Sequence, residues 1–187
     1  MDPTSDLVRR CIAGDSSAFE RLVREYMNTV LGLAYNYVGN FSTAEDIAQE
    51  TFVQAFQSLE SLRDGARFKV WLLKIARNKS IDAIRRSPRW ISLDQMREVE
   101  REVSMQSVPV TADPGFEFCE EDLIAALWSL REDYREIFVM KHINNLSYKE
   151  ISLILGMTVS AVGEKLYRVR SMIREKLEGI KLRSDLS

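Results

Sequence analysis

The sequence from Ser42 to Arg86 is STAEDIAQETFVQAFQSLESLRDGARFKVWLLKIARNKSIDAIRR, and it predicts two helices joined by a short loop. Ser42 and Glu45 are three residues apart and predict a capping box at the start of the first helix. Apolar and small residues then recur at helical spacing, which is typical of a stripe buried in a core. This stripe consists of Ala44, Ile47, Ala48, Thr51, Phe52, Ala55 and Leu59.

The exposed faces of the two predicted helices differ in charge. No Lys or Arg occurs from Ser42 to Leu62, so the first helix can offer only carboxylates and amides to a partner. From Arg67 to Arg89 there are eight Lys or Arg residues against one acid, Asp82. The outer face of the first helix consists of Asp46, Gln49, Glu50, Val53, Gln54 and Gln57, and the first apolar turns of the second contain Phe68, Trp71, Leu72 and Ile75.

A basic helix with aromatic residues near its start suits single-stranded nucleic acid. Cations neutralise phosphates, and aromatic rings stack on unpaired bases for about 1–3 kcal/mol each. The alternative is a surface helix that is merely basic, with Trp71 and Phe68 in the core. The residues of this helix alone leave both possibilities open.

The same residues resemble a known family. The segment AEDIAQETFVQAF, then F-x-x-W-L-x-x-I-A-x-N, then D-x-x-R-R is similar to regions two-point-two to two-point-four of bacterial sigma factors. Within the sigma-seventy family, the small extracytoplasmic-function (group four) sigma factors are the most similar group. The resemblance implies that core RNA polymerase binds Asp46, Gln49, Glu50 and Val53.

The resemblance also implies a minus-ten DNA surface. In this family the loop equivalent to residues 60–67 captures a flipped base of the promoter, and Asn78 is expected beside that pocket. Several relatives carry Phe where this chain has Leu62, so the base that is captured can differ. The expected minus-ten residues are Leu62, Arg63, Asp64, Phe68, Lys69, Trp71, Lys74, Arg77, Asn78 and Lys79.

Composition limits the other possibilities. The chain has 187 residues, a length that suits one large domain or two small ones. Its residues are 45% hydrophobic and 29% charged, and its net charge is −2. Cys11 and Cys119 show no metal-ligand or disulfide pattern, and His142 is the only histidine. Since no nucleophile motif, phosphate loop or metal cluster is visible, we expect no enzyme and no cofactor. We also expect a cytoplasmic protein without membrane insertion, because no apolar run approaches 18 residues.

Helical patterns fill the rest of the first half. Residues 2–13 predict a short helix, and Ser17 with Glu20 predicts a capping box for a longer one that stops at Gly39-Asn40. Residues 87–118 contain three prolines and many acids, which predicts an acidic linker with a possible short helix at 94–103.

The C-terminal segment predicts a helix-turn-helix. After helices at 120–130 and 133–141, Ser147 and Glu150 form a capping box, and Leu146 can pack on Ile151 as a hydrophobic staple. Gly156 ends this short helix, and a longer helix runs from about residue 160 towards Gly179. Its core stripe is Val162, Leu166, Val169, Ile173 and Leu177. The alternative is an αα-hairpin with a charged outer face.

This segment, LSYKEISLILGMTVSAVGEKLYRVR, resembles sigma region four, which implies binding to the minus-thirty-five duplex. Relatives commonly carry a basic residue and Ser where this chain has Gly163-Glu164, so an unusual target sequence is expected. Lys165, Arg170 and Arg174 are expected to reach phosphates. The expected minus-thirty-five residues are Ser160, Ala161, Gly163, Glu164, Lys165, Tyr167 and Arg168.

The sequence thus predicts an all-α protein of two small helical domains. We expect a region two domain at 1–86, a linker at 87–118 and a region four domain at 119–187. The expected partners are core RNA polymerase, promoter DNA in duplex and single-stranded form, and an anti-sigma factor. The competing hypothesis is a stand-alone DNA-binding regulator whose first half dimerises or senses a ligand; an inhibitor of a regulator is a more distant third. We expect the face around Asp46, Gln49 and Glu50 to carry no basic side chain. Such a face favours a polymerase subunit, because a stand-alone regulator does not need it.

Overall fold

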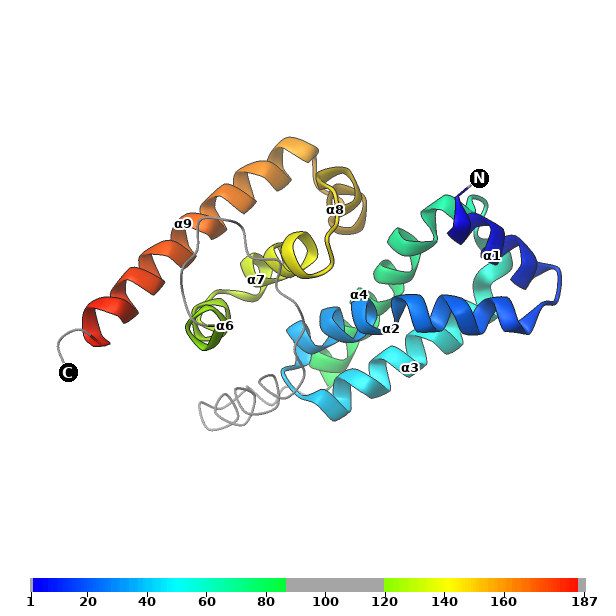
Figure 1. Ribbon diagram of the computed structural model, residues 1–187, viewed down its shortest axis with the longest axis horizontal. Coiled ribbons are helices and arrows are strands. Elements are labelled where there is room, and N and C mark those ends of the chain that lie inside the picture. Colours follow the sequence, from blue (N-terminus) through cyan, green and yellow to red (C-terminus); the bar gives the residue numbers. More distant parts are fainter. Residues whose placement is uncertain (1, 87–119, 185–187) are drawn as a thin grey trace. The chain divides into compact units, whose positions relative to one another are not determined.

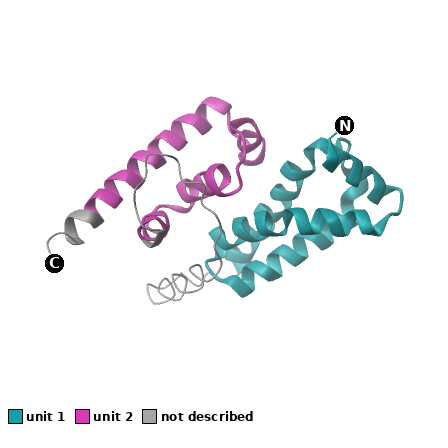
Figure 2. Cartoon of the chain, in the orientation of Figure 1, with its two compact units in different colours: residues 1–90 teal, residues 91–187 magenta. Residues whose placement is uncertain are grey.

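The computed structural model describes residues 2–86 and 120–184, and every element in these two ranges is helical. The predicted all-α class is therefore confirmed for the described chain. The chain divides into two compact units, residues 1–90 (unit 1) and 91–187 (unit 2), drawn in two colours in Figure 2. The predicted linker at 87–118, the short helix at 94–103 and Cys119 lie outside the described residues.

Unit 1 is built from four α-helices (Figure 1): α1 (Pro3–Ile12), α2 (Ser16–Val38), α3 (Phe41–Ser58) and α4 (Phe68–Arg86). Helix α2 packs against the other three, and α3 packs against α4. Two short 3₁₀ turns, η1 (Leu59–Ser61) and η2 (Gly65–Arg67), connect α3 to α4. The predicted stripe of α3 is confirmed, because each of its seven members is buried.

The starts of α2 and α3 correct two predicted capping boxes. Asp15 caps α2, accepting from the backbone N–H of Ser17 at 3.0 Å, and Asn40 caps α3, accepting from the N–H of Thr43 at 2.9 Å. Each cap lies two residues before the predicted Ser, and its extended backbone lets the helix begin earlier. The predictions from Ser17 and Ser42 were wrong because the side chains of Asp15 and Asn40, just upstream, accept the first-turn N–H groups instead.

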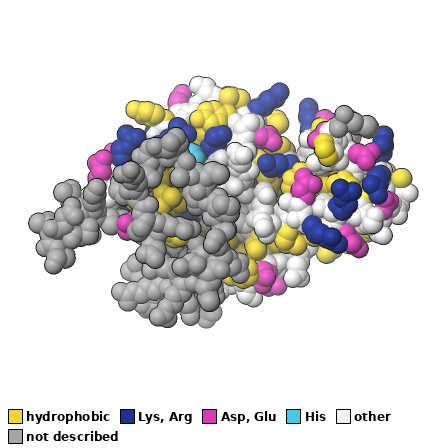
Figure 3. Space-filling model, in the orientation of Figure 1, with side chains coloured by type: hydrophobic (Ala, Val, Ile, Leu, Met, Phe, Trp, Pro, Cys, Tyr) yellow, Lys and Arg dark blue, Asp and Glu magenta, His cyan; other side chains and the backbone are white. Residues whose placement is uncertain are grey.

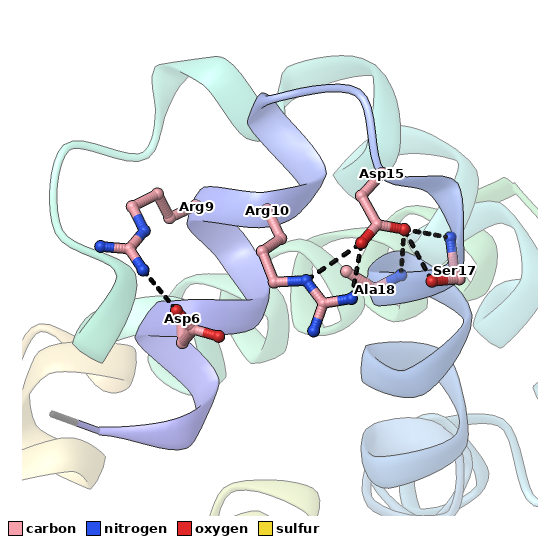
Figure 4. A network of polar contacts seen from close by, with 6 residues as sticks. All are labelled: Asp6, Arg9, Arg10, Asp15, Ser17 and Ala18. Atoms are coloured by element: carbon pink, nitrogen blue, oxygen red, sulfur yellow. Dashed lines mark hydrogen bonds and ion pairs between the residues drawn. The ribbon is translucent and has the colours of Figure 1, made fainter.

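The Asp15 cap also joins α1 to α2. Figure 4 shows its carboxylate accepting from Ser17 and Ala18 and, on the other side, from the Arg10 guanidinium at 2.6 and 3.0 Å. The Ser17 hydroxyl and Arg10 stabilise the charged form, so the pKa of Asp15 falls to about 2. This cap fixes the turn between the first two helices.

Unit 2 contains α6 (Glu120–Trp128), α7 (Glu132–Phe138), the π-helical turn η3 (Val139–Ile143), α8 (Tyr148–Leu155) and α9 (Val159–Ser184). The Ser147–Glu150 capping box of α8 is confirmed, and both Leu146 and Ile151 are fully buried, as a staple requires. Gly156 ends α8 with a φ of +67°, which glycine adopts without strain. The α9 stripe from Val162 to Leu177 is also fully buried.

Candidate docking and nucleic-acid surfaces

The outer face of α3 forms one side of a groove that we call the acidic groove. It is lined by Asp46, Gln49, Glu50, Val53, Gln54, Gln57 and Lys79, and its volume is about 610 Å³. The structure thus brings together all six residues that periodicity assigned to this face. Val53 is 57% exposed in the groove, so an apolar contact lies among the carboxylates and amides.

The presence of Lys79 corrects the expectation that this surface carries no basic side chain. It comes from α4, and its Nζ lies 3.0 Å from Glu50 Oε2. The Lys79 side chain is only 24% exposed, whereas that of Glu50 is 69% exposed. Lys79 was expected in the minus-ten surface; the structure places it in the acidic groove instead.

The loop between α3 and α4 contains hydrogen bonds between residues close in sequence. The Leu62 N–H donates to the Leu59 carbonyl at 3.0 Å, and the Ala66 N–H donates to the Asp64 carboxylate at 3.1 Å. Asp64 also forms an ion pair with Arg67 at 3.3 Å. Asp64, expected to bind DNA, therefore also shapes the loop.

Helix α4 buries one of the expected DNA-stacking aromatics. Phe68 is fully buried, with its ring 5.5 Å from that of Tyr26 and 6.0 Å from that of Trp71. The expectation that Phe68 contacts DNA was wrong, because the first turn of α4 points this ring into the core of unit 1. Trp71 is only partly buried, so one of the two aromatic rings remains accessible.

The remaining expected residues of this surface are accessible to different degrees. Lys74 and Asn78 are exposed and lie one helical turn apart on α4, so they share a face. Arg63, in the loop, is exposed. Leu62, Lys69 and Arg77 are partly buried. Trp71, Lys74 and Asn78 therefore form an accessible strip on one face of α4.

In unit 2 the exposed face of α9 carries most of the expected minus-thirty-five residues. Ser160, Glu164, Tyr167 and Arg168 are exposed, and Tyr167 is 77% exposed. Ala161 and Gly163 are partly buried. A Cβ on Gly163 would lie 3.7 Å from the Tyr148 ring of α8, which is an ordinary contact. The space beside Gly163 therefore does not require glycine.

Lys165 lies apart from that face. Its side chain is 20% exposed, and its Nζ lies 3.0 Å from Asp133 Oδ2 and 5.3 Å from the centre of the Tyr134 ring. Burial opposes ionisation of Asp133, but the hydrogen bond and charge of Lys165 outweigh burial, so the pKa of this carboxyl is lowered. Lys165 thus joins α9 to α7 and is less available to a phosphate than the sequence suggested.

Phe56 is an exposed residue that periodicity did not assign to either face. It is 57% exposed, and its ring packs edge-on to Phe19 with centroids 4.9 Å apart. Phe56 follows Val53 by three positions and lies outside the buried stripe, and this spacing indicates that it shares the exposed side of the helix. The apolar surface of α3 is therefore larger than Val53 alone.

Charges elsewhere on unit 1 are interleaved. In Figure 3, Lys and Arg alternate with Asp and Glu over the end that carries α1. Several of these charges are paired: Arg9 with Asp6, Arg10 with Asp15, and Arg24 with Glu20. The face of this end that Figure 3 shows therefore carries charges of both signs.

The described residues contain no group of three metal-ligating side chains. Among these residues, too, no helix combines the length and apolar character that crossing a membrane requires.

Cys11 is partly buried, and burial raises the pKa of its thiol. Its role is therefore consistent with packing.

Family models match both halves of the chain. Sigma-70 region 2 matches residues 22–89, and Sigma-70 region 4 matches residues 120–173. The ECF RNA polymerase sigma factor SigW of Bacillus subtilis is 31% identical over 183 residues, covering 92% of this chain and 96% of that protein. The ECF RNA polymerase sigma-E factor of Haemophilus influenzae is 30% identical over 181 residues, covering 92% and 94%.

Two solved structures share the fold. CnrH in complex with the cytosolic domain of CnrY gives a TM-score of 0.70 at 25% identity and covers 95% of this chain and 99% of that one. RpoE of Bartonella quintana in complex with the anti-sigma factor NepR gives a TM-score of 0.61 at 23% identity, covering 86% and 96%.

Proposed function

The chain belongs to the extracytoplasmic-function sigma factors of the sigma-70 family, and from this we propose that it is an alternative sigma factor of RNA polymerase. It recognises promoters and takes part in transcription initiation with core polymerase. The observation that carries this function is the pairing of two surfaces on adjacent helices. One is the acidic groove of α3, and the other is the basic, aromatic surface of α4.

The three segments take separate tasks in this function. Residues 1–86 bind core polymerase and the minus-ten element, residues 87–118 act as a linker, and residues 119–187 bind the minus-thirty-five element. Like its sigma-factor relatives, the chain acts by binding, and we assign it no catalytic step and no cofactor. Its site of action is the cytoplasm, where core polymerase and DNA are found.

The acidic groove serves as the polymerase-binding site. Asp46 and Glu50 offer carboxylates to a basic partner surface, and Val53 supplies an apolar centre within the polar rim. Lys79 neutralises part of this charge, so the partner must supply an acceptor for Lys79 or displace it from Glu50. A partner surface of mixed charge therefore fits the groove better than a uniformly basic one.

The α4 surface promotes strand separation by differential binding. Trp71 can stack on an unpaired base, Lys74 can neutralise a phosphate, and Asn78 can hydrogen-bond a base edge. Duplex DNA keeps its bases stacked and paired, so these contacts favour the separated strand. Melting on this basis requires no nucleotide hydrolysis by the chain.

The exposed face of α9 serves as the minus-thirty-five reader. Arg168 can contact a phosphate or guanine, whereas Glu164 can accept from cytosine N4. With Gly163 beside it, Glu164 favours a target that differs from that of relatives with a basic residue here. An anti-sigma factor is the expected regulatory partner, since NepR binds the similar RpoE in the solved complex.

A charge-reversal experiment tests the docking surface. Asp46→Lys with Glu50→Lys should abolish the capture of core polymerase in a pull-down, because both carboxylates are exposed and face the groove. The circular dichroism spectrum should not change. Glu20→Lys is the matched control, since Glu20 is an exposed acid of α2 outside the groove. Capture of core polymerase at wild-type affinity by the double variant would exclude the groove as the docking site.

A further inference from the structure

The N-terminal helix α1 packs against the loop for which the family resemblance implies capture of a promoter base. It contacts both 3₁₀ turns, η1 and η2, and Figure 1 shows it beside the connection between α3 and α4. Between the two turns, Leu62 and Asp64 have extended backbones, with φ, ψ of −79°, 100° and −135°, 104°. Short 3₁₀ turns have poor hydrogen-bond geometry and are weakly stable by themselves, so this loop depends on what packs against it.

Gly65 approaches the backbone of α1 closely. A Cβ on Gly65 would lie 2.9 Å from the Cα of Ser5 and 3.3 Å from its carbonyl oxygen. Among the described residues the glycines with positive φ are Gly14, Gly39 and Gly156, so the φ of Gly65 is one that alanine can adopt. What requires glycine at residue 65 is therefore the proximity of α1 and not the local backbone conformation.

A chain of side chains anchors α1 at this position. The Thr4 hydroxyl lies 3.1 Å from the Tyr26 hydroxyl, and the Tyr26 ring packs edge-on to Phe68, 5.5 Å between centroids. Phe68 in turn contacts Trp71, the accessible aromatic of the α4 surface. Leu7 and Val8 of α1 are buried. This packed path thus connects α1 to the stacking residue, and the approach of Gly65 to Ser5 connects α1 to the loop.

We propose that α1 is a positioning element for minus-ten recognition: by closing over Gly65, it holds residues 62–67 in the conformation that accepts an unpaired base. Gly65 and Thr4 are the positioning residues. They act through the loop and through Phe68, and neither needs to touch DNA. This inference rests on the proposed minus-ten binding of residues 1–86 and on the base capture that the family resemblance implies for this loop.

The perturbation is Gly65→Ala in the full chain, assembled with core polymerase. The added methyl group must push α1 away from the loop, because the Ser5 Cα that it meets belongs to backbone. The probe is a single-stranded oligonucleotide selected from a random pool by the wild-type holoenzyme. We expect roughly tenfold weaker binding, the loss expected when one stacked base is no longer held. We also expect base preference to relax at one position only, which general destabilisation would not produce.

The control is Gly179→Ala, where a Cβ meets nothing within 4 Å. Affinity for core polymerase should be unchanged in both variants. If Gly65→Ala prevents holoenzyme formation, Thr4→Val takes its place with the same expectation, because it removes the hydrogen bond to Tyr26 and preserves the side-chain shape. Wild-type affinity and base preference in the perturbed holoenzyme would overturn the role of α1. A wild-type holoenzyme that selects no sequence would instead overturn the proposed function.

Discussion

Replacing Lys165 and Arg168 separately distinguishes a lysine that supports the fold from an arginine that binds DNA. The sequence assigned both to the minus-thirty-five surface. In the structure the Lys165 side chain is 20% exposed and pairs with Asp133 at 3.0 Å, whereas Arg168 is exposed on the outer face of α9. We therefore expect Lys165→Gln and Arg168→Gln to change different properties of the protein.

The expected magnitudes follow from counterion release and from the ion pair. Each lost phosphate contact reduces the slope of log K against log salt by about 0.9, which is a roughly threefold effect between 50 and 200 mM salt. Arg168→Gln should show this change. Lys165→Gln should leave the slope unchanged and remove a partly exposed ion pair worth about 1 kcal/mol at most. For a unit of this size, that loss lowers the Tm by up to about 4–8 °C.

The assay is fluorescence anisotropy of holoenzyme with a promoter duplex across a salt series, together with thermal unfolding of each variant. Wild-type protein measured in parallel gives the reference slope. A reduced slope for Lys165→Gln, with an unchanged Tm, would show that Lys165 leaves Asp133 to bind a phosphate. An unchanged slope for Arg168→Gln would remove Arg168 from the interface.

Three further predictions concern the other surfaces. Trp71→Ala and Asn78→Ala should each impair open-complex formation more than duplex binding, since both residues act on unpaired bases; permanganate footprints identical to wild type would count against this role. Glu164→Arg should change the preferred base within the minus-thirty-five element, because Arg reads guanine where Glu accepts from cytosine; identical sequences selected from a random library by both proteins would contradict it. The Asp15 carboxylate has a folded-state pKa depressed from 3.8 to about 2, so it stabilises unit 1 fully above about pH 4 and this stabilisation is lost as the pH falls towards 2. Asp15→Asn should therefore reduce the acid sensitivity of the Tm, and an unchanged pH profile would refute this.

The buried stripes could be predicted from the sequence because helical periodicity reflects burial directly. The α3 stripe from Ala44 to Leu59 and the α9 stripe from Val162 to Leu177 are both buried as expected. Helix starts were harder, since Asp15 and Ser17, or Asn40 and Ser42, are all good cap residues. The residue that caps the helix depends on where the chain leaves the preceding turn. The apolar periodicity within the helix does not contain that information.

Contacts between elements could not be predicted from periodicity. Phe68 is buried because Tyr26 of α2 faces it, and Lys79 reaches Glu50 because α4 packs beside α3. Lys165 turns towards Asp133 for the same kind of reason. The close approach of Gly65 to Ser5 also depends on packing.

Transcription in vitro tests the central claim most directly. Purified chain and core RNA polymerase would be incubated with a library of randomised promoter templates, and the RNA products would be sequenced. The proposed function predicts that the chain makes core polymerase start RNA synthesis at templates sharing a minus-ten and a minus-thirty-five element. Synthesis from no template, combined with tight binding of intact duplex by the chain alone, would contradict it and favour a stand-alone regulator.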